Sequence, residues 1–146
     1  ISGGIRNGAD VAKAMALGAD AVSIGSAAMI ALGDNDPKWE KDYNKLGSTA
    51  GAYDDWHEGL DPAGITTQDP NLQDGLDPLN KSARVGNYAQ NLTKAVKMIA
   101  HACGVKHPRL LRRTHAQMIT EKGIPETLSK IYPDKSPLQS IQMAGT

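Results

Sequence analysis

Ser2-Gly3-Gly4-Ile5-Arg6 and Ile24-Gly25-Ser26 are the two stretches of sequence that decide the fold. Residues 1–6 read as a strand end that enters the first glycine turn, and residues 20–24 read as a short strand before the second. Each turn also precedes a helical pattern. This order of strand, turn and helix, repeated once over short loops, is typical of a βαβ unit, so we predict that the two strands are parallel.

The helices that follow the two turns carry recognisable end signals. Asn7 is a good N-cap for the first helix, and Asp10 lies in its first turn, where a carboxylate faces the positive end of the helix dipole. Gly18 is a natural terminator for this helix. The second helix is predicted over residues 26–32.

Two glycine turns at the carboxyl ends of neighbouring parallel strands favour an anion site, because backbone N–H groups at a helix N-terminus point at the ligand. In (β/α)₈ barrels, the loops after strands 7 and 8 commonly form a phosphate site. Gly3 and Gly4 would let the backbone approach a phosphate, and Arg6 would add a positive charge. Gly25 and Ser26 would complete the cradle. Simple turn geometry is the alternative explanation for glycines at these positions.

Residues 34–80 have a different character. They contain four prolines, several glycines and aspartates, and no sustained period. We predict a long, acidic, irregular segment with at most brief helices, for example around residues 39–46. A stretch of this kind is unusual inside a compact domain and is usually functional or packed against something else.

Residues 81–103 form the clearest helix of the sequence, because apolar side chains recur at spacings of three and four. The stripe consists of Val85, Tyr88, Ala89, Leu92, Val96, Ile99 and Cys103. Gly104 and Pro108 end this helix. A second helix is predicted over residues 107–122 and a short third one over 125–131, and the chain from Pro133 onward reads as an extended tail.

The net charge of zero conceals an asymmetry. Residues 34–80 carry eleven acidic and three basic groups, whereas residues 81–146 carry eleven basic and three acidic groups. We expect the two segments to neutralise each other. Binding of nucleic acid by the basic segment is not expected, because it lacks interleaved aromatic residues.

The composition describes a globular protein with a small aliphatic core. There is no Phe, aromatic residues make up 4%, and no apolar run approaches the roughly 18 residues of a membrane span. The single cysteine and the absence of a signal sequence favour the cytoplasm. The first residue is Ile1, already inside a predicted strand, which indicates a piece of a longer polypeptide.

The segment from Ser2 to Gly25 resembles the last two βα units of FMN-dependent barrels, a group that includes IMP dehydrogenases, 2-hydroxyacid oxidases and glutamate synthases. Two further segments, 26–33 and 61–68, resemble glutamate synthases in particular, and the second matches their Cys-Pro-x-Gly-Ile-Ala-Thr-Gln segment. The resemblance covers residues 1–70 well, and the helix at 81–103 is consistent with the next part of the chain in that family.

This resemblance implies a fold, a cofactor and a reaction. The fold class is α/β: residues 1–33 would be the last two βα units of a (β/α)₈ TIM barrel, 34–80 an acidic loop segment and 81–146 a basic helical extension. FMN would be the cofactor, and the enzyme would reduce a 2-iminoglutarate-like intermediate to glutamate or an N-substituted glutamate, as an N-methylglutamate synthase subunit would. The cofactor-binding residues would be Ser2, Gly3, Gly4, Arg6, Gly25 and Ser26.

Two of these positions depart from related barrels. Ser2 stands where many FMN barrels have an acidic residue, and Ser26 stands where the hydroxyacid oxidases carry an arginine, so the positive charge would rest on Arg6.

The resemblance fails at three cysteines that hold a three-iron cluster in glutamate synthases. The corresponding residues here are Asp34, Trp56 and Asp61. Because iron–sulfur clusters need thiolate ligands, we predict that no such cluster is bound. Electrons would then arrive from another subunit or from a diffusible reductant.

Other clusters of polar residues are weaker candidates. The group Asp54, Asp55, His57, Glu58 and Asp61 could attract a divalent cation, but its spacing fits no defined loop, and a solvated or subunit-facing acidic loop is the simpler interpretation. His101 and Cys103 do not share a helix face, which argues against a nucleophile pair. No metal site is predicted, and Trp39 and Trp56 are expected to anchor the acidic segment by packing.

Two alternatives stay open. One is a flavin-free barrel enzyme, an isomerase or synthase, whose substrate phosphate occupies the site, and the other is a non-catalytic structural subunit. The catalytic residues would come mainly from earlier strands and are unknown. We expect the preceding part of the barrel or companion subunits as partners, an oligomer, a small amino-acid or keto-acid substrate, and neither nucleic acid nor membrane.

Overall fold

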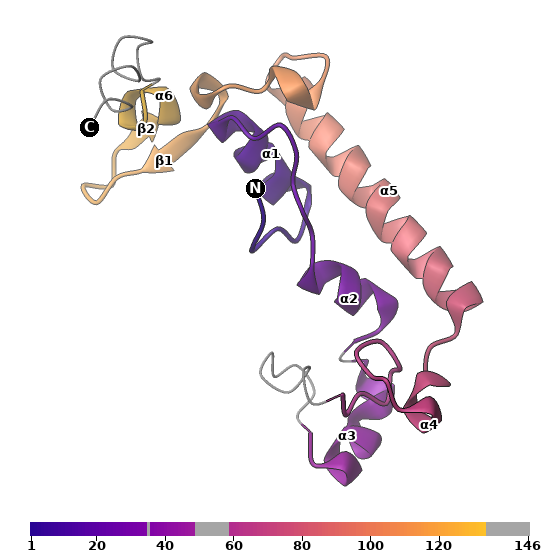
Figure 1. The fold of residues 1–146 in the computed structure, drawn as a ribbon. Helices are drawn as coiled ribbons and strands as arrows, with labels where there is room; N and C mark the ends of the chain where they lie inside the picture. The colour runs from indigo at the N-terminus through magenta and orange to yellow at the C-terminus, as the bar shows by residue number, and fades with distance from the viewer. Residues whose placement is uncertain (35, 49–58, 134–146) are drawn as a thin grey trace, which may run out of the picture. The chain divides into compact units, whose positions relative to one another are not determined.

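The computed structural model describes residues 1–34, 36–48 and 59–133 of the 146-residue chain (Figure 1). The chain packs as two compact units. The first unit consists of Ile1, Asn7–Val22 and the residues from Ala95 onward, and the second consists of Ser2–Arg6 and Ser23–Lys94. The long helix α5 (Pro78–Ala102) contributes residues to both.

Helix α1 (Gly8–Leu17) belongs to the first unit, and its predicted ends are confirmed. The Asn7 side chain accepts hydrogen bonds from the backbone N–H groups of Ala9 and Asp10, at 2.9 and 3.1 Å. Gly18 ends the helix at φ 109°, a left-handed conformation that glycine adopts without strain. A Cβ at Gly8 would lie 2.6 Å from the Ala95 Cβ, so glycine permits a close approach here.

The predicted helix over residues 107–122 is wrong. Two 3₁₀ turns, Pro108–Leu110 and Arg113–His115, are followed by an antiparallel hairpin of β1 (Gln117–Ile119) and β2 (Pro125–Thr127) (Figure 1). Gly123 makes the reversal possible with φ 73°. Apolar residues at mixed spacings fit a strand as well as a helix, and the pairing of β1 with β2 decides between them.

The short third helix is confirmed only in its second half. Residues 125–127 belong to β2, and α6 (Leu128–Ile131) follows them directly. The guanidinium of Arg113 donates to the backbone carbonyls of Tyr132 and Leu17, at 2.8 and 3.3 Å, and so connects the chain after α6 to the end of α1. The predicted tail lies almost wholly outside the described residues.

The second unit contains α2 (Ser26–Leu32), a 3₁₀ turn (Pro37–Trp39), α3 (Glu40–Leu46), α4 (Pro70–Gln73) and the first part of α5. Helix α2 has the predicted bounds, and the brief helix around residues 39–46 is present. Most of the remaining described chain between α3 and α5 is irregular, as predicted.

The two predicted strands appear as a single bridge between Ser2 and Ser23, and that bridge is parallel. Within the described residues the only named sheet is the two-stranded one of β1 and β2. Two short parallel segments without neighbouring strands on their outer edges leave most of their backbone groups without ladder partners. The architecture is therefore α/β, with mostly helices and a small sheet.

The buried hydrophobic residues are few and mostly aliphatic, as the composition predicts, with alanines prominent among them and Tyr43 as an aromatic member. The α5 stripe is buried at Val96 and half-buried at Val85, Leu92 and Ile99. Among the helices that the structure describes, none is both long and apolar enough to cross a membrane.

Candidate functional site

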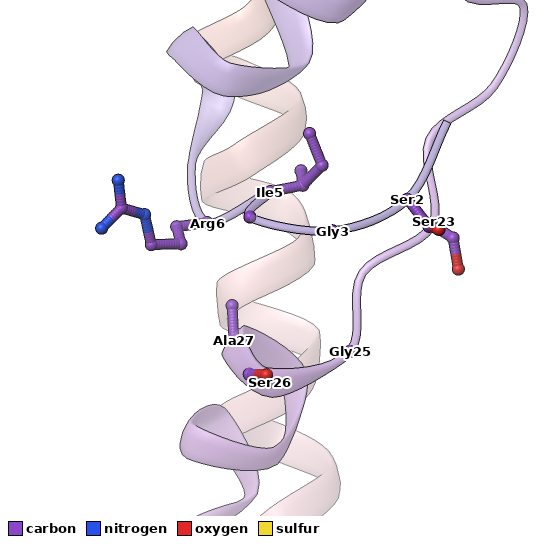
Figure 2. Close-up of a pocket in the computed structure, with 9 residues that line it drawn as sticks. Ser2, Gly3, Ile5, Arg6, Ser23, Gly25, Ser26 and Ala27 are labelled. Atoms are coloured by element: carbon purple, nitrogen blue, oxygen red, sulfur yellow. The ribbon is translucent and has the colours of Figure 1, made fainter. Parts of the chain in front are cut away.

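The two glycine turns line one cavity of about 440 Å³ in the second unit. Its lining contains the six residues singled out from the sequence, Ser2, Gly3, Gly4, Arg6, Gly25 and Ser26, together with Ile5, Ser23 and Ala27. The parallel bridge between Ser2 and Ser23 brings the two strand ends together, so the turns that follow them face the same space (Figure 2). The size is within the usual range of small-molecule sites.

Two of the three glycines of the cavity adopt a backbone conformation that favours glycine, and all three leave space at the cavity wall. Gly3 and Gly4 both have left-handed φ values, 91° and 69°, which side chains other than glycine adopt only at a cost. A Cβ at Gly3, Gly4 or Gly25 would meet no protein atom within 4 Å. The missing side chains therefore leave space at the backbone, which an approaching ligand atom could use.

Helix α2 begins at the cavity, with Gly25 at its N-cap position. By helix geometry, the first backbone N–H groups of α2 have no acceptor inside the helix. Ser26 and Ala27 are in this first turn and both line the cavity. The arrangement offers N–H donors and the Ser26 hydroxyl to an acceptor in the cavity.

Arg6 contributes to the cavity differently from the prediction. Its backbone closes the first turn, but Figure 2 shows its side chain extending away from Ser2 and Ser23. Arg6 is an exposed residue, and in this conformation its side chain is not directed at Ser2 or Ser23. The Arg6 carbonyl accepts a hydrogen bond from the Tyr88 hydroxyl of α5 at 2.9 Å.

Asp61, in the acidic segment, is the centre of a second polar arrangement. Its side chain is almost completely buried and accepts from the backbone N–H groups of Ala63, Ile65 and Thr66, at 2.8–2.9 Å. The Tyr43 hydroxyl donates to it at 2.9 Å and the Thr66 hydroxyl at 3.3 Å. Burial by itself raises the pKa of Asp61, but these hydrogen bonds outweigh it, and the pKa lies below its ordinary value.

Asp61 is one of the three residues that replace the cluster cysteines. Because donors of its own turn and of Tyr43 already surround both carboxylate oxygens, this carboxylate is a structural acceptor. Asp34 directly follows Gly33, which ends α2, and Trp56 lies outside the described residues. Across the described residues, no group of three or more His, Cys, Asp or Glu side chains is placed to hold a metal ion.

The other candidate residues do not come together. Asp54, Asp55, His57 and Glu58 lie outside the described residues, so the proposed acidic loop is not tested. His101 is exposed in the last turn of α5, and Cys103 is half-buried just after it. His107 and His115 each accept a backbone N–H through Nδ1, from Arg109 and Arg112, which gives them a local structural role.

Two tyrosines make polar contacts that the sequence pattern does not predict. Tyr88 belongs to the apolar stripe predicted for its helix, and Tyr43 has no predicted role. Their hydroxyls bond to Arg6 and to Asp61, which lie 82 and 18 positions away. A tyrosine in an apolar stripe, such as Tyr88, carries one polar atom that needs a partner when buried. The sequence therefore offered a reason to expect a hydrogen bond from Tyr88, and none for Tyr43.

The comparisons with known proteins agree on one family. The family model described as the conserved region in glutamate synthase matches residues 1–37 and 52–106. A glutamate synthase large subunit-like protein of Rhizobium meliloti is 53% identical over 146 residues, which is all of this chain and 30% of that protein.

More distant relatives carry the same family name. The archaeal glutamate synthase [NADPH] of Methanocaldococcus jannaschii is 41% identical over 111 residues, 76% of this chain and 19% of that protein. The archaeal-type glutamate synthase [NADPH] of Thermotoga neapolitana is 38% identical over 112 residues, 77% of this chain and 19% of that protein. No solved structure matches. The chain spans less than a third of the length of these relatives, and by its matches it belongs to the glutamate synthase family.

Proposed function

We propose that the chain is the FMN-phosphate-binding end of a glutamate synthase-type oxidoreductase, in which residues 1–33 are the last two βα units of a (β/α)₈ barrel. One observation carries the proposal: in a chain of this family, the six predicted residues line a single cavity between two glycine turns. The acidic segment 34–80 and the basic helical segment 81–146 are then additions to the barrel.

The residues of the cavity fit a phosphate group. A phosphate presents several acceptor oxygens and no donors, and the first turn of α2 offers backbone N–H groups and the Ser26 hydroxyl. Open space at Gly3, Gly4 and Gly25 permits the close approach that such bonds need. Arg6 supplies the positive charge once its exposed side chain turns toward the cavity.

The chemistry of this chain would be binding and orientation. When bound, FMN supplies hydride transfer to the imine of a 2-iminoglutarate-like substrate, giving glutamate or an N-substituted glutamate. The cradle would hold one end of the cofactor so that the ring is oriented toward residues outside this chain. The catalytic groups would belong to the preceding barrel or to companion subunits of a cytoplasmic oligomer, which are the partners that we expect.

We also propose that no iron–sulfur cluster is bound at the segment that resembles the cluster loop. The support is Asp61, whose carboxylate already stabilises its turn through buried hydrogen bonds and which carries no thiolate. Electrons would therefore reach the flavin by another route, from a different subunit or a diffusible reductant.

The test is the visible absorbance spectrum of the full-length protein, followed by release and chromatographic identification of the flavin and by assays of iron and sulfide. We expect FMN, and iron below stoichiometric amounts. Arg6→Gln should weaken FMN binding about tenfold, because an ionic hydrogen bond to phosphate is lost. Lys13→Gln, which removes an exposed cation of α1, is the control and should leave binding unchanged.

The alternatives give different results in the same experiment. A colourless protein that retains a phosphorylated metabolite would favour a flavin-free isomerase or synthase. A colourless protein without any ligand would favour a structural subunit. Stoichiometric iron and sulfide would contradict the proposed loss of the cluster.

A further inference from the structure

Helix α5 presents three side chains on one face to the segments that build the cavity. Lys81, Arg84 and Tyr88 are spaced three and four residues apart, so they lie along the same side of the helix. All three belong to the second unit, together with both glycine turns. This face contacts the first turn at Arg6 and the far end of the helix that follows the second turn, at Gly33 and Asp36.

Two of the three side chains lie at the end of α2. Lys81 is almost completely buried, and a Cβ at Gly33 would overlap its ammonium group. Arg84 forms an ion pair with Asp36, with Nη1 and Oδ2 3.3 Å apart. The helix that begins at the cavity is therefore anchored at its other end on α5.

The third side chain lies at the first glycine turn. The Tyr88 hydroxyl donates to the Arg6 carbonyl at 2.9 Å, and Arg6 is the last residue of the turn in the cavity lining. The other end of this turn is held by the parallel bridge of Ser2 with Ser23. Gly3 and Gly4, both with left-handed φ values, lie between these two points. The turn is therefore held at both ends, while the glycines between them have the widest choice of backbone conformation.

We propose that Tyr88 is a positioning residue for the phosphate cradle: its hydroxyl sets the place of the Gly3–Arg6 turn relative to the start of α2. The proposal rests on the proposed function, because it assumes that the cradle takes the phosphate of a flavin. A positioning role differs from a general stabilising role in its effect on ligands. Loss of a positioning residue weakens the binding of a ligand that has a phosphate and leaves the binding of a ligand without a phosphate unchanged.

The experiment compares FMN with riboflavin, which has the same ring and side chain but no phosphate. Both dissociation constants are measured by flavin fluorescence in the flavin-depleted full-length protein, for the wild type and Tyr88→Phe. Loss of one positioning hydrogen bond should weaken FMN binding about two- to tenfold, with riboflavin binding unchanged. Tyr132→Phe, which removes the hydroxyl of a half-exposed tyrosine in the first unit, is the matched control and should change neither.

The outcomes separate this proposal from the one on which it rests. A wild-type preference for FMN that Tyr88→Phe leaves intact overturns the positioning role alone. Equal weakening of FMN and riboflavin in Tyr88→Phe also overturns it, because that result indicates a general structural role. A wild-type protein that binds the two flavins equally overturns the phosphate cradle, and the role of Tyr88 with it.

Discussion

Replacing Asp61 with Asn should destabilise the segment between α3 and α4 strongly, although the two side chains have almost the same shape. In the structure, Oδ1 accepts from the Tyr43 hydroxyl and the Ala63 N–H, and Oδ2 accepts from the N–H groups of Ile65 and Thr66. An asparagine keeps only one of these acceptor oxygens and places two N–H donors where the other one was.

The magnitude can be worked out by counting the donors that lose an acceptor. In one orientation of the amide, the N–H of Ala63 faces another donor, and in the other orientation the N–H groups of Ile65 and Thr66 do. A hydrogen bond to a charged group contributes about 1.5–3 kcal/mol, and a buried donor left without a partner carries a penalty of its own. We therefore expect the free energy of unfolding to fall by about 2–4 kcal/mol.

The assay is urea denaturation of the full-length protein, with hydrogen–deuterium exchange of peptides that cover residues 60–67. We expect faster exchange of these peptides in Asp61→Asn than in the wild type, which would locate the loss of stability in this turn. Asp69→Asn is the matched control, because Asp69 caps α4 and asparagine caps helices equally well. If Asp61→Asn changes stability by no more than Asp69→Asn does, the structural role assigned to the carboxylate is wrong.

Acid should remove the stabilisation that the Asp61 carboxylate provides. Because the pKa of Asp61 in the folded protein lies below its ordinary value of 3.8, the carboxylate stabilises the fold fully above that value. The stabilisation is lost as the pH falls through the lower pKa of the folded state. Acid unfolding of Asp61→Asn should lack this part of the pH dependence, and an unchanged acid profile would contradict the hydrogen-bonded carboxylate.

Three further predictions concern stability, each measured by urea denaturation of the full-length protein. Gly47→Ala should lower the free energy of unfolding by about 1 kcal/mol, and Gly64→Ala should lower it several times more. Both glycines have φ near 75°, but only Gly64 has backbone atoms of residues 72–76 within 3 Å of an added Cβ. Equal costs would refute the packing argument. Asn7→Ala should lose about 1 kcal/mol, the usual value of an N-cap, and no loss would show that the cap is unimportant. Lys81→Met should gain about 1 kcal/mol, since the buried ammonium has no hydrogen-bond partner among the described residues and burial lowers its pKa; a loss of stability would indicate a partner elsewhere in the protein.

The local elements near the start of the chain could be predicted because their signals act over a few residues. Asn7 caps α1 through N–H groups two and three positions away, and Gly18 and Gly33 end their helices in left-handed conformations. These side-chain and backbone interactions are local, so they form without contacts to another segment of the chain. The same reasoning places α2 at residues 26–32.

The error at residues 107–122 has the opposite cause. The apolar residues of this segment fit two periods, and the choice depends on a partner strand that the local sequence does not identify. The antiparallel register, in which Met118 lies opposite Glu126, depends on the turn at Gly123 and on contacts outside the segment.

The sequence by itself determined the two glycine turns and the ends of α1 and α2, because each depends on residue types at short and regular spacings, and the motifs around those turns carried the resemblance to the family. Only the tertiary structure decided where the Arg6 side chain extends, that Tyr88 bonds to the Arg6 carbonyl, and that the Asp61 carboxylate accepts from both its own turn and Tyr43. Hydrogen bonds between residues 82 or 18 positions apart form when packing brings one donor to one acceptor. The periodicity of the sequence does not predict such contacts between distant residues.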